Sequence, residues 1–291
     1  MPHINHARAA RQRAPILARQ RAFLPTVSVL SALVLGLMPL AARAQSTVPV
    51  PGQDLAGCLQ RVERSPEGGF EWALAWQDRG GGDAARLCQA MALYHAGNYA
   101  GAAARLESLA RTPGLAAQAP ELWARAGAAW LRGNRPAEAE RTYAEAIRLR
   151  PDDAELRIDR AVARATAERY WEAVEDLDRA IALKPDAVEA LVLRGQAHRA
   201  LNNLPKAQAD AAQALRIAPN DPEALLLRGN LRALAGEVGP AREDWQRVAR
   251  LDPDSAAGVA ARDNLARVQP GGAPGAASPA GRAGTPGSGN R

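Results

Sequence analysis

Aromatic residues are scarce in this sequence. Phe, Trp and Tyr make up only 4% of the 291 residues, although hydrophobic residues make up 47%. Alanine supplies much of this apolar content. Because alanine is the best helix former and a poor strand former, the composition favours closely packed helices over a core built from a β-sheet.

Residue types that carry out catalysis are also few. After residue 44 the histidines are His95, at the end of an expected helix, and His198, on an expected helix face, and we interpret both as structural or solvated. A Ser or Cys nucleophile needs a base beside it. The sequence contains no H-E-x-x-H, no Walker loop and no zinc-ligand spacing. It therefore predicts a protein that is not an enzyme, with no catalytic residue, no metal and no cofactor.

Acidic residues are absent from the first 44 residues, which contain six arginines. The other 31 of the 37 basic residues are balanced by all 31 acidic residues, so the rest of the chain has no net charge. Acidic and basic residues also alternate along the expected helices. Because a nucleic-acid groove needs a uniformly positive surface, we expect no nucleic-acid partner.

No apolar run is long enough to span a membrane. The longest, Val27 to Leu40, is shorter than the about 20 residues that a spanning helix needs. Arginines precede the run, and the small-x-small sequence Ala42-Arg43-Ala44 follows it. This pattern predicts a secretory signal peptide that is cleaved after Ala44, and hence a periplasmic or secreted protein without stable membrane insertion. The alternative is an uncleaved membrane anchor.

The middle of the chain repeats itself at a step of 34 residues. Prolines recur at Pro151, Pro185, Pro219 and Pro253. Small residues recur in an expected first helix and early in an expected second helix, at Gly127, Ala161, Gly195, Gly229 and at Ala139, Ala173, Ala207, Ala241. Small residues at matched depths let two antiparallel helices approach closely. Self-similarity at a fixed step of this length indicates an array of stacked units.

These residues resemble the tetratricopeptide repeat, a helix–turn–helix unit of 34 residues with small residues in these slots and a proline at its end. The resemblance implies an all-α fold, a right-handed α-solenoid of antiparallel helix hairpins. Together with the predicted signal peptide, it indicates an exported protein of bacterial type. The sequence departs from the family pattern in two places. The large aromatic residue usual early in the first helix is present only as Trp123, and Ala211 is small for its slot.

The repeat divides the chain into segments. Glycine and proline dominate the end of the chain, which cannot bury enough apolar surface to offset its ordering entropy. The predicted segments are a signal peptide (1–44), a linker (45–51), an N-terminal helical hairpin (52–82), a degenerate repeat (83–119), four regular repeats (120–153, 154–187, 188–221, 222–255), a capping helix (256–269) and a disordered tail (270–291).

Two cysteines lie about one repeat apart, in the expected first helices of consecutive hairpins. Such helices stack side by side, and an exported protein meets an oxidising compartment. We therefore predict a structural disulfide between Cys58 and Cys88, with free thiols as the alternative. The two cysteines are not spaced as C-x-x-C, so a redox-active motif is not supported.

Charged residues also recur at the 34-residue step. Arginine is followed sixteen residues later by aspartate in three blocks, and the first block lacks both. This joint presence and absence predicts structural ion pairs, Arg160 with Asp176, Arg194 with Asp210 and Arg228 with Asp244. In addition, Asp152, Asp186 and Asn220 each precede a glutamate by three residues (Glu155, Glu189, Glu223), which predicts helix N-caps.

The resemblance also implies a concave face, formed by the first helices, that binds a peptide or helix segment of another protein. The residues expected to line it are Ala124, Ala128, Arg132, Ile158, Val162, Thr166, Val192, Gln196, Arg199, Leu226, Asn230 and Leu234. The Lys and Asn cluster with which some members clamp a C-terminal carboxylate is missing, which speaks against chaperone-tail binding. The alternative is that these positions are solvated helix faces in an array with a purely structural role.

The sequence therefore predicts a periplasmic adaptor or scaffold for protein–protein interaction. Two alternatives stay open. One is a general chaperone of the cell envelope, and the other is an accessory subunit of an envelope enzyme or secretion complex.

Overall fold

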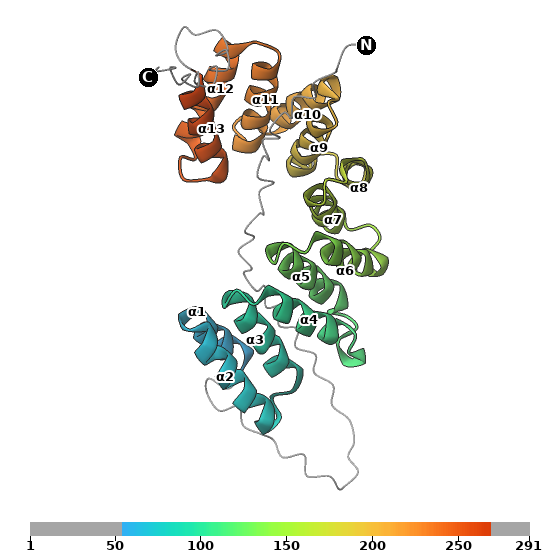
Figure 1. Ribbon diagram of the computed structural model, residues 1–291. Helices are drawn as coiled ribbons and strands as arrows, with labels where there is room; N and C mark the ends of the chain where they lie inside the picture. The colour runs from blue at the N-terminus through green and yellow to red at the C-terminus, as the bar shows by residue number, and fades with distance from the viewer. Residues whose placement is uncertain (1–53, 269–291) are drawn as a thin grey trace, which may run out of the picture. The chain divides into compact units, whose positions relative to one another are not determined.

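The computed structural model describes residues 54–268, in which all regular secondary structure is helical (Figure 1). The predicted signal peptide, linker and tail lie outside the described residues. The described chain forms two compact units, which meet in the sequence between Asn203 and Leu204. We call them unit 1 and unit 2. The division falls inside the predicted repeat 188–221.

Unit 1 is a series of helices in which each packs against the next. Its helices are α1 (Leu55–Arg64), α2 (Pro66–Trp76), α3 (Gly82–His95), α4 (Tyr99–Ala110), α5 (Ala119–Arg132), α6 (Pro136–Leu149), α7 (Ala154–Thr166), α8 (Tyr170–Leu183) and α9 (Val188–Ala200). Helix α5 also contacts α7, and α7 contacts α9, so the first helices of successive hairpins are neighbours. The predicted all-α fold of stacked helix hairpins is confirmed.

Unit 2 consists of α10 (Leu204–Ile217), α11 (Pro222–Leu234), α12 (Val238–Leu251) and α13 (Ala256–Arg267). Helices α11 and α12 form a hairpin, and α13 packs against both of them. Ala257 and Ala261 of α13 are buried in this contact. Helix α13 thus covers the end of the hairpin, as the end of a repeat array requires.

All three predicted N-caps are one residue too early. Helix α7 is capped by Asp153, whose Oδ1 accepts from the backbone N–H of Glu155 at 3.0 Å, and α11 is capped by Asp221, which accepts from Ala224 N–H at 2.8 Å. The residue after each proline belongs to the turn, so the extended backbone that an N-cap needs falls one residue later. The N-cap of α9 is Ala187, which provides no side-chain cap.

Two of the small slots of the first helices are filled by rings from the second helices. A Cβ atom added to Gly127 would lie 2.7 Å from Cζ of Tyr143, and one added to Gly229 would lie 2.7 Å from Nε1 of Trp245. Both rings are buried. Glycine therefore permits the close approach of α5 to α6 and of α11 to α12.

We expect Gly127→Ala to lower the free energy of unfolding by about 1–2 kcal/mol, because the clash with Tyr143 outweighs the better helix propensity of alanine. Gly239→Ala in α12 is the control, because nothing lies within 4 Å of the added Cβ. It should stabilise the protein by up to about 1 kcal/mol. Denaturant titrations of the two variants test the difference in sign, and an equal effect would contradict the packing argument.

Candidate protein-binding face and its supporting contacts

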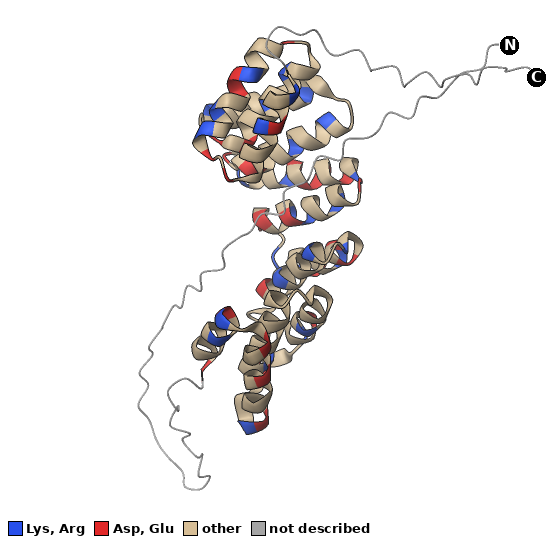
Figure 2. Ribbon diagram, turned by 60° about the vertical axis from the view of Figure 1, so that its left-hand side comes forward, with Lys and Arg blue, Asp and Glu red and all other residues tan. Residues whose placement is uncertain are grey.

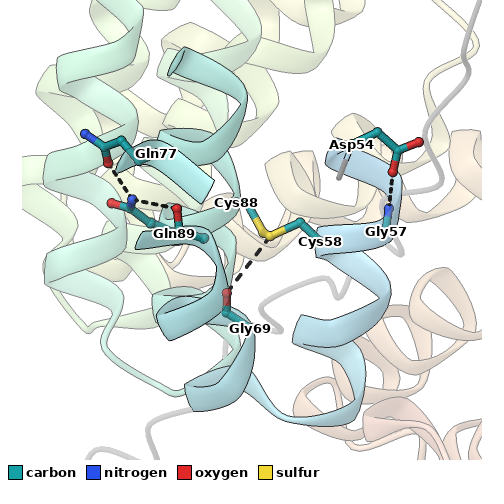
Figure 3. The surroundings of a disulfide bond; sticks show 8 residues. Asp54, Gly57, Cys58, Gly69, Gln77, Cys88 and Gln89 are labelled. Carbon is teal, nitrogen blue, oxygen red and sulfur yellow. Dashed lines mark hydrogen bonds between the residues drawn. A yellow bond between two sulfur atoms is a disulfide. The ribbon is translucent and has the colours of Figure 1, made fainter. Parts of the chain in front are cut away.

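A disulfide fastens the N-terminal hairpin to the rest of unit 1. Cys58 of α1 and Cys88 of α3 are bonded, with Cα atoms 6.2 Å apart, and both are fully buried (Figure 3). The bond confirms the predicted pairing. Next to it the buried Gln89 donates a hydrogen bond of 2.6 Å to Oε1 of Gln77.

Two of the three predicted ion pairs are present, each within one hairpin. The guanidinium of Arg160 donates two hydrogen bonds, of 2.8 and 2.6 Å, to the carboxylate of Asp176. Arg228 binds Asp244 in the same way, at 3.0 and 2.6 Å. Arg194 belongs to unit 1 and Asp210 to unit 2, so the third pair stays a prediction. Within unit 1, Arg194 donates to Asp178 at 2.7 Å.

A second arginine, which the sequence analysis missed, contacts each of these aspartates. Arg164, one helical turn after Arg160, lies 2.9 Å from Asp176. Arg232 takes the same place beside Asp244, at 2.8 Å. Arginine occurs in this slot in two of the four blocks. This recurrence at the 34-residue step could have indicated the second arginine. The same slot holds Trp130 and His198 in the other two blocks, which hid the pattern.

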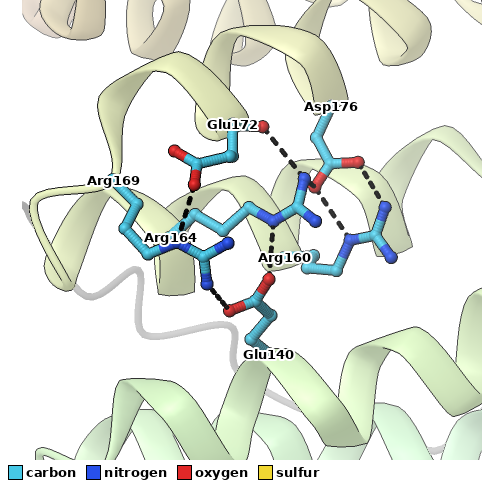
Figure 4. Close-up of polar contacts among 6 residues, drawn as sticks. All are labelled: Glu140, Arg160, Arg164, Arg169, Glu172 and Asp176. Carbon is cyan, nitrogen blue, oxygen red and sulfur yellow. Dashed lines mark hydrogen bonds and ion pairs between the residues drawn. The ribbon is translucent and has the colours of Figure 1, made fainter.

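The contacts of Arg164 extend from one repeat to the next (Figure 4). Its Nε donates to Glu140 of α6 at 2.9 Å, and its Nη1 donates to the backbone oxygen of Glu172 at 3.0 Å. Arg169, which precedes α8, binds the carboxylates of both Glu140 and Glu172. These charges connect α6, α7 and α8.

A similar set of polar contacts, with fewer charged groups, joins the helices one repeat earlier. Glu107 of α4 accepts from Trp130 Nε1 at 2.8 Å and from Thr142 Oγ1 at 3.1 Å. Trp130 and Thr142 occupy the slots that Arg164 and Asp176 fill in the next repeat. The first block thus lacks the arginine–aspartate pair because another set of polar groups joins its helices.

Three of the residues predicted to line the concave face are buried. Ile158, Val192 and Leu226 are 1%, 4% and 8% exposed. Ile158 packs in a core cluster with Leu177 and Ala190, from the neighbouring helices α8 and α9. The prediction that these three residues contact a partner is therefore wrong. Ile158 faces these neighbouring helices and not the solvent.

The remaining predicted residues are at least partly exposed. In unit 1 they are Ala124, Ala128, Arg132, Val162, Thr166, Gln196 and Arg199, and we call these seven residues of α5, α7 and α9 the first-helix face. In unit 2, Leu234 is 59% exposed. Asn230 is engaged inside unit 2, because its Oδ1 accepts from Trp245 Nε1 at 3.0 Å and from Asn264 Nδ2 at 2.9 Å.

The first-helix face has charges of opposite sign at its two ends. The first turns of α5, α7 and α9 contain Glu121, Glu155 and Glu189. The last turns of α5 and α9 contain Arg132 and Arg199, and between the two ends the face presents small, apolar and amide side chains. A segment that lies along these helices would therefore meet an acidic end and a basic end.

Elsewhere on the molecule, charges of both signs alternate along the helices of each unit (Figure 2). Within residues 54–268 we find no cluster of three or more His, Cys, Asp or Glu that could hold a metal ion. In the same part of the chain, no helix combines the length and the apolar character needed to cross a membrane.

Glu223, in the first turn of α11, has an unusual titration. Burial raises its pKa to about 7, and the charge of Asp221 acts in the same direction. An acid with a raised pKa in the folded state binds its proton more tightly there than in the unfolded chain. The stability that this proton contributes is complete below the unfolded pKa and is lost as the pH rises to about 7.

We therefore expect Glu223→Gln, which cannot ionise, to be more stable than the native protein by about 1–2 kcal/mol at about pH 8, and to differ little at about pH 5. The measurement is the free energy of unfolding at the two pH values. The exposed Glu243 of α12 serves as the control, because Glu243→Gln should give the same small difference at both. A pH-independent effect of Glu223→Gln would contradict the assignment.

A model of the tetratricopeptide repeat matches this chain four times, over residues 87–154, 125–188, 158–222 and 192–256. The matches together span residues 87–256, which is more than half of the chain. The chain belongs to the tetratricopeptide repeat family. Repeats of this family are protein-interaction modules.

No curated protein matches this chain. Solved structures do. The second TPR domain of the human RPAP3 protein, in complex with the HSP70 peptide SGPTIEEVD, is 25% identical, with 39% of this chain and 98% of that chain covered and a TM-score of 0.37. MamA from Desulfovibrio magneticus RS-1 is 18% identical, with 57% and 93% covered and a TM-score of 0.49. YrrB, described as a TPR protein with an unusual peptide-binding site, is 19% identical, with 62% and 91% covered and a TM-score of 0.46.

Proposed function

We propose that this protein is a periplasmic adaptor or scaffold that binds a segment of another protein on its first-helix face. Membership of a family of protein-interaction modules supports the class of function. The observation that carries the choice of surface is that Ala128, Val162 and Gln196 recur at the 34-residue step on neighbouring helices and stay partly exposed. Uncharged side chains in such a row, among them the small Ala128, leave room for a peptide backbone.

Export is a separate part of this proposal. The buried disulfide between Cys58 and Cys88 is of a kind that forms and persists in oxidising compartments. The sequence before Gln45 has the arginines, the apolar run and the small-x-small site of a secretory signal peptide, which would direct export to such a compartment. N-terminal sequencing of the protein purified from the periplasmic fraction should begin at Gln45. Full-length protein confined to the cytoplasm would contradict export.

Photo-crosslinking tests the binding face directly. A photoreactive amino acid placed at Val162, on the first-helix face, should crosslink to one dominant protein in intact cells. The same amino acid at Ala182, an exposed position of α8, is the matched control and should not. Crosslinks of equal strength from both positions, or from neither, would overturn the proposal for this face.

A pair of alanine variants then tests whether the face is needed. Ala128→Glu should abolish capture of the crosslinked partner, whereas Ala137→Glu, at an exposed position of α6, should leave capture unchanged. Substitutions at Ile158 or Val192 do not serve, because both side chains belong to the core. Many weakly captured proteins would instead indicate a chaperone, and copurification with one activity would indicate an accessory subunit.

A further inference from the structure

Arg199, in the last turn of α9, has a buried guanidinium nitrogen without a hydrogen-bond partner. Its Nε is buried and makes no hydrogen bond, and within residues 54–268 the side chain forms no ion pair. Three other partly buried arginines of unit 1 differ. Arg160 and Arg164 bind Asp176, and Arg157, whose Nε is also buried, donates from Nη2 to the backbone oxygen of Pro151 at 2.7 Å.

The surroundings of Arg199 do not compensate its charge. Burial lowers the pKa of its guanidinium, and in the described part of the chain the titratable group that acts against this effect is the phenol of Tyr170, on the first turn of α8. A charged group that is removed from water without an ion-pair partner is unfavourable. An incoming anion at the terminal nitrogens of this guanidinium would offset the cost of burying its charge.

We propose that Arg199 anchors the carboxylate of an Asp or Glu side chain inside the partner segment that binds the first-helix face. This inference rests on the proposed function and names the chemistry of the partner. A guanidinium binds a carboxylate through two parallel hydrogen bonds, which fix position as well as supply energy.

The charge pattern of the face favours this occupant. Arg132 and Arg199 lie in the last turns of α5 and α9, so an acidic side chain is directed to the end of the face that holds Arg199. Residues next to that acid would lie on Val162 and Gln196, which suit small or apolar neighbours. One acidic residue with uncharged neighbours in an internal segment is therefore the partner sequence that fits.

Selection from a random peptide library tests the anchor. Peptides are displayed on phage between two linkers, so that no free C-terminal carboxylate is present, and are selected on the full-length protein and on Arg199→Met. Peptides from the native protein should share Asp or Glu at one position, and Arg199→Met should lose this preference. Arg179→Met, at an exposed position of α8, is the control and should keep it.

The outcomes separate the two proposals. Peptides without a shared acid, or with the same acid selected by Arg199→Met, would overturn the anchor and leave the binding function standing. Binding of peptides only in a parallel library with free C-termini would also overturn it, because the anion would then be a main-chain carboxylate. Failure of the native protein to select any peptide in either library would overturn the proposed function and the anchor together.

A double-mutant cycle with one selected peptide and its Glu→Gln form measures the interaction. Each single change should weaken binding about 10- to 100-fold, and the two together should weaken it no further. In the absence of peptide, Arg199→Met should raise the melting temperature, because it removes an unpaired charge and keeps the length of the side chain. A lower melting temperature together with additive losses of affinity would show that Arg199 serves the fold and not a partner.

Discussion

Replacing Asp176 by alanine is expected to lower the free energy of unfolding by about 3–5 kcal/mol, because it leaves two arginines without the carboxylate that they share. The side chain of Asp176 is only 4% exposed, and those of Arg160 and Arg164 are 17% and 16% exposed. Neither guanidinium can turn fully to water without breaking the packing of α7 on α8. The expected loss of stability is therefore much larger than for the removal of an ion pair on the surface.

Asp178 provides the matched control for this prediction. It lies in the same helix as Asp176 and also binds an arginine, Arg194, but its side chain is 57% exposed. Asp178→Ala should change stability by less than about 1 kcal/mol, as exposed ion pairs do. Denaturant unfolding of the two variants measures the difference, and equal losses would contradict the role of burial.

Loss of the disulfide should have the second large effect. The bond joins residues 30 apart in sequence. Closing a loop of that length restricts the unfolded chain by about 3–4 kcal/mol. Because each hairpin of a repeat array contacts only its neighbours, the destabilisation should be concentrated in α1 and α2, the hairpin that the bond fastens to α3.

Hydrogen exchange with and without a reductant tests this prediction. Reduction should speed the exchange of amides in α1 and α2 and leave α6 to α8 unchanged. The variant with both Cys58→Ala and Cys88→Ala should exchange fast in α1 and α2 under both conditions. Equal protection of the N-terminal hairpin in the oxidised and reduced protein would show that packing alone holds it in place.

Local repetition made much of this fold predictable. A 34-residue step with small residues at fixed depths specifies helix hairpins, because only small side chains permit the close helix contacts seen between Gly127 and Tyr143. Cys58 and Cys88, 30 residues apart, were expected on neighbouring first helices, and Arg160 and Asp176, 16 residues apart, recur together as a pair within one hairpin. In each case the spacing within or between hairpins fixes which residues meet, so a pattern in the sequence corresponds to a contact in space.

The errors lie where a residue's surroundings depend on more than its own repeat. Ile158 was assigned to the binding face because it lies on a first helix, but the neighbouring α8 and α9 cover it. Arg164 was not singled out from the sequence, although it connects Asp176 with Glu140 of the preceding repeat. A single repeat does not show which of its exposed positions the next repeat will bury.

The sequence by itself determined the family, the helix hairpins, the disulfide and two of the ion pairs. Only the tertiary structure decided which residues of the first helices stay accessible and which charges lack a partner. The physical reason is that periodicity records the contacts that every repeat makes alike, whereas burial and ion pairing at a given residue depend on the side chains of adjacent helices. Arg199 illustrates this difference, because its unpaired guanidinium follows from the helices around it and from no motif in the sequence.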